Sequence, residues 1–325
     1  MPVTSVVSDP HALTVTLVAD FPVGPERLWK AFTDPRQLER FWGPPGYPAT
    51  FGAFDLRPGG IADYAMTSPR GEVSRGRWEF TKVSDPSSFE VIDTFVDDSG
   101  DAMDMPASRT EFAFTGTDGG GRVTSTTHFT SVEALEQLTA MGMIEGLTMG
   151  VNQLDIVLRD LREYAQSRGA ELEILDDQHV RITRVIRGPR ELVWRAHFEP
   201  ELMQKWLLGP DGWTMPVCET STEVGGTYRY EWEPAPGVEG ERFGFEGEVL
   251  HVEPGRRAVT TERMIGMPDG PTTINDLSLY EEDGVTLLTQ LIEYPDAATR
   301  DMILETGMVD GMEASYARME ALVLA

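Results

Sequence analysis

The feature that most constrains this chain is an internal repeat with a period of about 165 residues, half of its 325-residue length. Five anchors recur in the same order at nearly constant spacing. They are Trp29 with Trp194, Pro35 with Pro200, Arg40 with Lys205, Gly59–Gly60 with Gly225–Gly226, and Gly142–Gly146 with Gly307–Gly311. A period this long indicates duplicated whole domains. We therefore predict homologous domains at 1–166 and 179–325, joined by a short polar linker at 167–178.

Each repeat shows the same succession of patterns. Apolar and polar residues alternate over Leu13–Phe21, which predicts a strand, and Pro25 and Pro35 are well placed to begin two short helices. Six more strand-like segments follow between turn-forming clusters: Thr50–Leu56, Ile61–Met66, Gly71–Val83, Glu90–Val96, Thr110–Thr115 and Val123–Thr130. Helical spacing of apolar residues then predicts one long helix over Ser131–Ala165, and its counterpart over about Asp296–Val323.

Close spacing of the strands favours antiparallel meander connections and therefore an α+β fold with seven strands in each repeat. One face of such a sheet must be buried, and the long C-terminal helix is the element large enough to cover it. A sheet wrapped around one helix often keeps a cavity between the two. We therefore expect a cavity in each repeat.

The order of elements and the anchor motifs resemble a known family. The segment GPERLWKAFTDP and its counterpart GPRELVWRAHFEP, the following GG turn, and a terminal helix that opens with G-M-x-x-G are similar to the activator of Hsp90 ATPase homologue 1-like (AHSA1-like) branch of the START/polyketide-cyclase (SRPBCC) superfamily. The resemblance covers nearly the whole of each repeat. It implies two tandem helix-grip (START/Bet v 1-like) domains, each a curved antiparallel seven-stranded sheet gripping a long C-terminal helix. Trp29 and Trp194 would then be core residues.

The resemblance implies that the cavities bind or sequester a hydrophobic or aromatic small molecule. A polyketide or an enediyne-type natural product would suit, and antibiotic self-resistance by sequestration or self-sacrifice is the sharper version. Two alternatives stay open: a polyketide aromatase/cyclase, and a protein-interaction module of the Hsp90 co-chaperone type. The residues favour a ligand-binding protein over an enzyme, because no nucleophile motif is present.

Aromatic, methionine and basic side chains supply the candidate ligand-binding residues. Rings that alternate along one strand share a face and suit the stacking of a flat ligand, and methionine adapts to irregular apolar shapes. An arginine or a histidine could bind a ligand oxygen, or serve as the acid–base group of an aromatase/cyclase. The candidates are Trp42, Phe54, Tyr64, Trp78, Arg109, His128, Met143, Leu147, Trp206, Trp213, Tyr228, Tyr230, Trp232, Arg263, Met308 and Met312.

We predict no metal and no cofactor. The five histidines do not lie at ligand spacing, and the acidic loop that contains Asp101 and Asp104 lacks the ordered positions of a calcium loop. The RPGG and EVGG motifs precede strands, so they do not predict phosphate binding. The single cysteine, Cys218, is expected to be a small buried residue.

The net charge of the chain restricts the classes of molecule that it is expected to bind. The net charge is −27, which disfavours nucleic acids and anionic lipid surfaces, and no apolar run is long enough to cross a bilayer. The N-terminal segment lacks the basic and apolar regions of a secretory signal. We expect a cytoplasmic protein, a monomer or weak dimer, whose partner is a hydrophobic small molecule.

Overall fold

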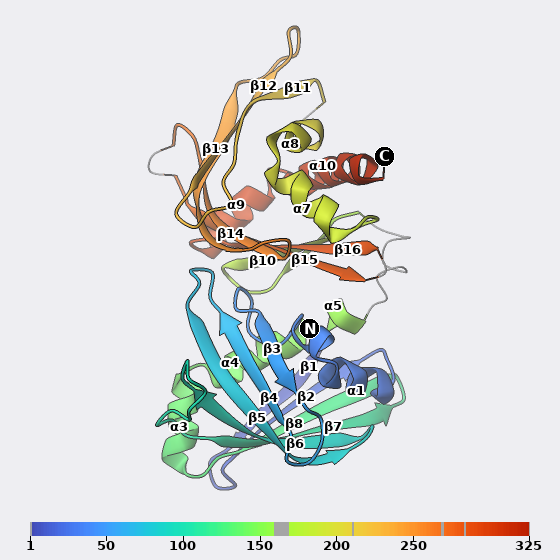
Figure 1. Ribbon diagram of the computed structural model, residues 1–325, viewed down its shortest axis with the longest axis vertical. Coiled ribbons are helices and arrows are strands. Elements are labelled where there is room, and N and C mark those ends of the chain that lie inside the picture. The colour runs from blue at the N-terminus through green and yellow to red at the C-terminus, as the bar shows by residue number, and fades with distance from the viewer. Residues whose placement is uncertain (1, 159–168, 210, 268–269, 283, 325) are drawn as a thin grey trace. The chain divides into compact units, whose positions relative to one another are not determined.

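The computed structural model describes residues 2–158, 169–209, 211–267, 270–282 and 284–324. It divides into two compact units, Met1–Ser68 with Glu72–Arg159 and Pro69–Gly71 with Asp160–Ala325. Each unit holds an eight-stranded antiparallel sheet and its own helices (Figure 1). The α+β fold with two tandem units is therefore confirmed, while the exact domain boundaries stay a prediction.

The first unit contains a sheet with five helices in the described part. Its elements are β1 (Val3–Asp9), β2 (Thr14–Phe21), α1 (Pro25–Thr33), α2 (Pro35–Leu38), β3 (Ala49–Phe54), β4 (Ile61–Thr67), β5 (Val73–Ser84), β6 (Ser88–Val96), β7 (Ser108–Thr117), β8 (Gly120–His128), α3 (Val132–Ala140), α4 (Met143–Asn152) and α5 (Asp155–Leu158).

The second unit repeats this order. Its elements are β9 (Glu171–Ile174), β10 (His179–Ile186), α7 (Arg190–Phe198), α8 (Pro200–Trp206), β11 (Trp213–Glu219), β12 (Thr227–Pro234), β13 (Phe243–Glu253), β14 (Arg257–Met264), β15 (Thr273–Glu282), β16 (Val285–Glu293), α9 (Ala297–Leu304) and α10 (Met308–Val323).

Both sheets have the same strand order. It runs β1-β2-β8-β7-β6-β5-β4-β3 in the first unit and β9-β10-β16-β15-β14-β13-β12-β11 in the second. The eighth strand that our sequence analysis missed is the outer one, β1 or β9. No residue of β1 or β9 is buried, so neither strand shows an alternation of buried and exposed side chains. Strand β9 also falls inside the segment expected to be a linker.

The single long helix expected in each repeat is interrupted. In the first unit α3 ends before Gly142, and in the second α9 ends before Gly307. Both glycines have φ near +80°, a left-handed conformation that costs an L side chain energy, so the chain turns there and a new helix begins. The last part of the expected first helix, residues 159–165, lies outside the described residues.

The first unit has an aromatic core between the sheet and α1. Strand β2 buries every second side chain, from Val15 to Phe21. Helix α1 begins at Pro25 and presents Trp29 and Phe32 to the sheet, where Trp29 meets Phe114 edge-on at 5.6 Å. In the second unit Trp194 packs, partly buried, against the core around Trp206. Both tryptophans of the repeat motif are thus packing residues.

Candidate functional site

A cavity of about 360 Å³ lies in the first unit. It is bounded by the inner face of strands β4 to β8, by helices α3 and α4, and by the loop that carries Trp42. Its volume falls within the range of small-molecule sites, and most of its wall is apolar. This is where a ligand would be enclosed between the sheet and its helices.

The sheet side of the cavity follows from the period-two alternation of strands. Side chains at every second position point to one face, so Val91, Asp93 and Phe95 of β6 all line the cavity. On the neighbouring strands Thr110 of β7 and Ser125 of β8 do the same. The wall is therefore apolar with a small number of polar groups placed at fixed positions.

The helix side follows from the 3.6-residue period of α4. Met143, Gly146, Leu147 and Gly150 are spaced i, i+3, i+4 and i+7, so they form one stripe along the helix. Two positions of this stripe are glycines. A Cβ added at Gly146 would meet nothing within 4 Å, so the missing side chain leaves space in the cavity rather than a close contact.

Asp93 is the one acidic side chain in the cavity wall. Its carboxylate accepts hydrogen bonds from the Tyr64 hydroxyl, at 3.0 and 3.2 Å to the two oxygens, and from the Trp78 side chain and the Thr94 backbone. Burial raises the pKa of Asp93 to about 6, against the lowering effect of these donors. Burial beside Asp93 also raises the pKa of Tyr64 well above 10.

Four more polar groups line the same cavity. The hydroxyls of Thr110 and Thr127 are 3.0 Å apart and bond to each other. The Ser125 hydroxyl and the Trp42 indole nitrogen are buried, and neither has a hydrogen-bond partner among the described residues. A buried polar atom without a partner is costly, so both atoms are suited to contact a ligand.

Five of the first-unit candidates from the sequence line this cavity: Trp42, Tyr64, Trp78, Met143 and Leu147. The structure therefore brings together residues from β4, β5, α4 and the Trp42 loop. The rings of Trp42 and Trp78 meet edge-on with centroids 4.9 Å apart. Whether these residues bind a ligand stays a prediction.

The remaining first-unit candidates do not line the cavity. Phe54 packs in the core against Phe80. Arg109 and His128 lie between inward-facing neighbours on β7 and β8, so alternation sends their side chains to the other face of the sheet. Arg109 there pairs with Glu90 at 2.6 Å. Residue type alone does not indicate which face of a strand is buried, and ligand binding by these three residues stays a prediction.

Most second-unit candidates have packing partners. The indole nitrogen of Trp206 donates to the Ala196 carbonyl, and that of Trp232 donates to the Leu207 carbonyl, each at 2.7 Å. Met308 and Met312 pack, partly buried, against core clusters. Arg263 pairs with Glu246 at 2.7 Å on the surface.

The predicted ring stripe of the second unit is present. Tyr228 and Tyr230 have ring centroids 4.8 Å apart, Tyr230 and Trp232 6.3 Å, and Trp213 contacts Phe243. Burial raises the pKa of both Tyr228 and Tyr230. These rings contact one another in tilted and edge-on arrangements, and ligand binding by them stays a prediction.

Sequence reasoning missed Asp93, Ser125 and Phe112 in the cavity wall. One signal for Asp93 was available. It is the only charged residue between Val91 and Val96, and it shares the inward face with Val91 and Phe95. A lone carboxylate on the apolar face of a strand indicates a buried, partnered or functional group.

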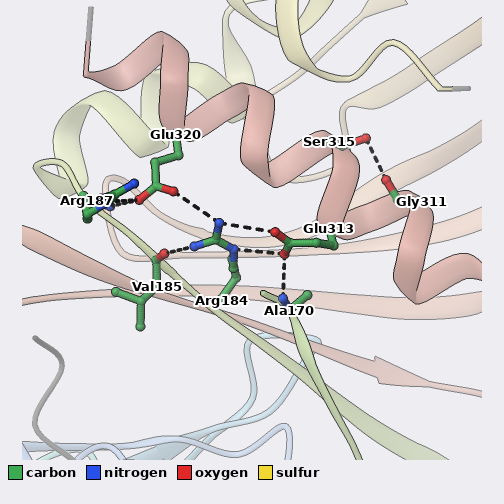
Figure 2. Close-up of polar contacts among 8 residues, drawn as sticks. All are labelled: Ala170, Arg184, Val185, Arg187, Gly311, Glu313, Ser315 and Glu320. Carbon is green, nitrogen blue, oxygen red and sulfur yellow. Dashed lines mark hydrogen bonds and ion pairs between the residues drawn. The ribbon is translucent and has the colours of Figure 1, made fainter. Parts of the chain in front are cut away.

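The space between sheet and helix in the second unit holds a buried ion cluster (Figure 2). Arg184 of β10 contacts Glu313 at 3.0 Å and Glu320 at 3.2 Å, both on α10. Arg187 also pairs with Glu320, at 2.8 Å, and the Ala170 backbone donates to Glu313. This cluster fastens α10 to the sheet.

Among the described residues no group of three or more His, Cys, Asp or Glu is placed to hold a metal ion. Cys218 is half-buried, and burial raises the pKa of its thiol to about 11, so it is a poor nucleophile at neutral pH. None of the described helices is long and apolar enough to cross a membrane.

Comparison with known proteins gives one family. The model of the activator of Hsp90 ATPase homolog 1-like protein matches residues 22–159 and 187–323. No curated protein matches the chain.

Similar solved structures include protein Ms6760 from Mycobacterium smegmatis, 45% identical, with a TM-score of 0.46, covering 49% of this chain and 98% of its own. A protein from Arthrobacter aurescens is 38% identical, with a TM-score of 0.47, covering 48% of this chain and 91% of its own. DynU16, a protein from the dynemicin biosynthetic locus, is 15% identical, with a TM-score of 0.34, covering 97% of this chain and 100% of its own.

Proposed function

This chain belongs to the family of activator of Hsp90 ATPase homolog 1-like proteins in both of its repeats, and we propose that its first unit binds a hydrophobic, partly aromatic small molecule. The observation that carries the proposal is the cavity of about 360 Å³ under α3 and α4. Rings of Trp42, Trp78 and Phe112 offer faces and edges for stacking. The few polar groups would fix the orientation of the ligand.

The finer proposal is that the ligand is a natural product of the polyketide or enediyne type, and that binding serves self-resistance. In a self-sacrifice mechanism a ligand-derived radical would abstract hydrogen from a glycine Cα next to the cavity, and dioxygen from solution would add to the resulting glycyl radical and lead to cleavage of the chain. The glycines that line the cavity are Gly43, Gly142, Gly146 and Gly150. Gly142 and Gly146 are the most open, because an added Cβ would meet nothing within 4 Å.

The aromatase/cyclase alternative loses its original acid–base candidates. Arg109 and His128 lie outside the cavity, and Arg263 pairs with Glu246 on the surface of the second unit. Sequestration requires no such group, so it is the function that the cavity supports best.

Cavity binding can be tested with 1-naphthalenemethanol, a neutral aromatic probe, by calorimetry and ligand-observed NMR. Gly146→Phe places a ring in the cavity from a helical position with open space beside it, and we expect it to weaken binding at least tenfold. The matched control is Gly311→Phe, at the equivalent position of α10, which is expected to leave the affinity within threefold. Unchanged binding in Gly146→Phe would contradict the proposal.

The finer proposal has its own measurement. Wild-type protein incubated with an activated enediyne and analysed by mass spectrometry is expected to give fragments that end between Gly142 and Gly150. An intact chain that gives no protection to DNA would exclude self-sacrifice and leave simple ligand binding standing.

A further inference from the structure

The cavity carries one anionic group whose charge has no counter-ion. Three lining residues titrate or are charged: Tyr64, Arg75 and Asp93. Tyr64 stays neutral because its pKa is raised, and Arg75 is half-exposed and pairs with Asp98 at 2.9 Å. Within the described ranges no cationic side chain forms an ion pair with Asp93. The cavity therefore has a net negative charge at neutral pH.

The partners of Asp93 favour its anionic form. The Tyr64 hydroxyl, the Trp78 side chain and the Thr94 backbone all donate to the carboxylate. Donors stabilise the ionised carboxylate, while burial opposes it, and the resulting pKa near 6 leaves Asp93 mostly ionised at pH 7.5. A buried anion without a cation carries a desolvation cost that an incoming cation would relieve.

The surrounding walls suit a cation attached to an apolar body. Trp78 lies beside Asp93 and meets Trp42, Tyr64 and Phe112, with ring centroids 4.9 to 6.0 Å apart. The faces of such rings attract ammonium groups electrostatically. Ser125 is 1% exposed and lines the same cavity, and its hydroxyl has no partner in the described part, so it can accept an N–H hydrogen bond.

We infer that the ligand of the first unit is a hydrophobic amine, whose protonated nitrogen pairs with Asp93 while its apolar body occupies the space between α4 and the aromatic walls. This rests on the proposed function, because it names the ligand class of the same cavity. A neutral hydroxyl could donate one hydrogen bond to Asp93 and would leave the charge uncompensated. A metal ion would find one carboxylate and no histidine or cysteine among the lining residues.

Three probes with one aromatic body test the inference: 1-naphthylmethylamine, 1-naphthalenemethanol and 1-naphthoate. At pH 7.5 they carry an ammonium, a hydroxyl and a carboxylate. For the wild-type protein we expect the amine to bind at least tenfold more tightly than the alcohol, and the carboxylate to bind most weakly. In Asp93→Asn the amine is expected to lose about thirtyfold in affinity, because a buried charge partner is removed. The alcohol is expected to change by less than threefold.

The control variant is Glu111→Gln, which changes the net charge by the same amount. Glu111 is exposed and lies between the inward-facing Thr110 and Phe112, so it points to the other face of the sheet. Its amine affinity is expected to stay within twofold of the wild type. An equal loss in both variants would assign the effect to the overall charge and overturn the inference.

Two other results distinguish the inference from the proposed function. Equal affinity of the wild type for amine and alcohol would overturn the amine inference and leave cavity binding intact. Failure of both probes to bind would overturn both. These wild-type comparisons require no variant to fold.

Discussion

The two units share one strand order, yet their terminal helices meet the sheet through different chemistry. At the repeat spacing of 165 residues, Arg184 and Glu313 of the second unit correspond to Ala19 and Thr148 of the first. Ala19 is a buried core residue, and the Thr148 hydroxyl bonds within its own helix, to the Ile144 carbonyl at 2.7 Å. The same order of elements therefore holds an ion cluster in one copy, and in the other a buried alanine and a threonine bonded within its own helix at the matching positions.

A second difference lies in one cross-strand pair of the sheet. In the first unit Ala62 of β4 faces Trp78 of β5, and at the matching register of the second unit Tyr228 of β12 faces Gly247 of β13. A Cβ added to Gly247 would lie 1.8 Å from the Thr261 carbonyl oxygen and 2.7 Å from the Tyr228 ring, so the position requires a glycine. Each pair keeps one large ring and one small residue, with the ring on opposite strands.

In each unit the large ring of this pair, Trp78 or Tyr228, donates a hydrogen bond to a buried carboxylate. Asp93 pairs with Ser108 in the register of β6 and β7, and Glu262 pairs with Thr273 at the same place in β14 and β15. Burial raises the pKa of Glu262, which Asn275 and Tyr228 lower through hydrogen bonds. The comparison teaches that an inward-facing carboxyl with an aromatic donor belongs to both units, while an ion cluster fastening the helix is described only in the second.

The largest expected effect comes from breaking the cluster in Figure 2. Arg184→Met removes a side chain that is 8% exposed and leaves Glu313 and Glu320 without their shared cation. We expect the second unit to lose about 3 kcal/mol of unfolding free energy. Urea unfolding measures this.

The control for that variant lies in the first unit. Arg122 pairs with Asp20 at 2.6 Å, and its side chain is 43% exposed. Arg122→Met is expected to cost much less unfolding free energy than Arg184→Met, because exposed ion pairs are screened by water. Equal costs for the two variants would show that the cluster does not fasten the helix.

An intermediate effect on the unfolding free energy is expected from the ionisation of Asp93, the buried carboxyl of the first unit. The pKa of Asp93 rises from 3.8 in the unfolded chain to about 6 in the fold, so the folded state binds the proton more tightly. Its contribution to stability is therefore largest below pH 4, falls as the pH rises from about 4 to 6, and stays constant above that. The full change corresponds to about 2–3 kcal/mol.

Asp93→Asn removes this dependence. Between pH 4 and pH 7 the variant is expected to gain about 2 kcal/mol relative to the wild type, measured by urea unfolding at each pH. Glu262→Gln should give the same sign in the second unit, since the pKa of Glu262 is also raised. A stability difference that does not vary with pH would refute the ionisation of Asp93 described above.

The sequence predicts the order and approximate bounds of most strands and helices in each unit. Alternation over Leu13–Phe21, prolines at the helix starts and the repeated glycines place the strands and helices near their observed bounds. The terminal helices were predicted as continuous because hydrophobic spacing continues through Gly142 and Gly307. Their left-handed backbone, which ends one helix and begins the next, carries no periodicity signal.

The interior was predictable only in part. Aromatic residues such as Trp42 and Trp78 stand out by type, while Asp93 and Ser125 acquire their role from facing a cavity that forms only on folding. Trp78 lies on the second strand of its cross-strand pair, whereas Tyr228 lies on the first strand of the matching pair. This difference depends on which residues are paired across the strands. Register of this kind is set by the whole sheet and is not readable from one strand.

The smallest expected effect tests whether the two helices remain equivalent at the paired glycines. Gly146 of α4 and Gly311 of α10 are helical, and a Cβ would meet nothing within 4 Å at either. Gly146→Ala and Gly311→Ala are each expected to stabilise their unit by about 0.5–1 kcal/mol, because alanine loses less backbone entropy on folding. Thermal unfolding measures both. Gly142→Ala, at a φ of +84°, is the control and should destabilise its unit by about 1 kcal/mol. Stabilisation by Gly311→Ala alone would mean that the space beside Gly146 does not accept a Cβ, and that the two helices are not equivalent at these glycines.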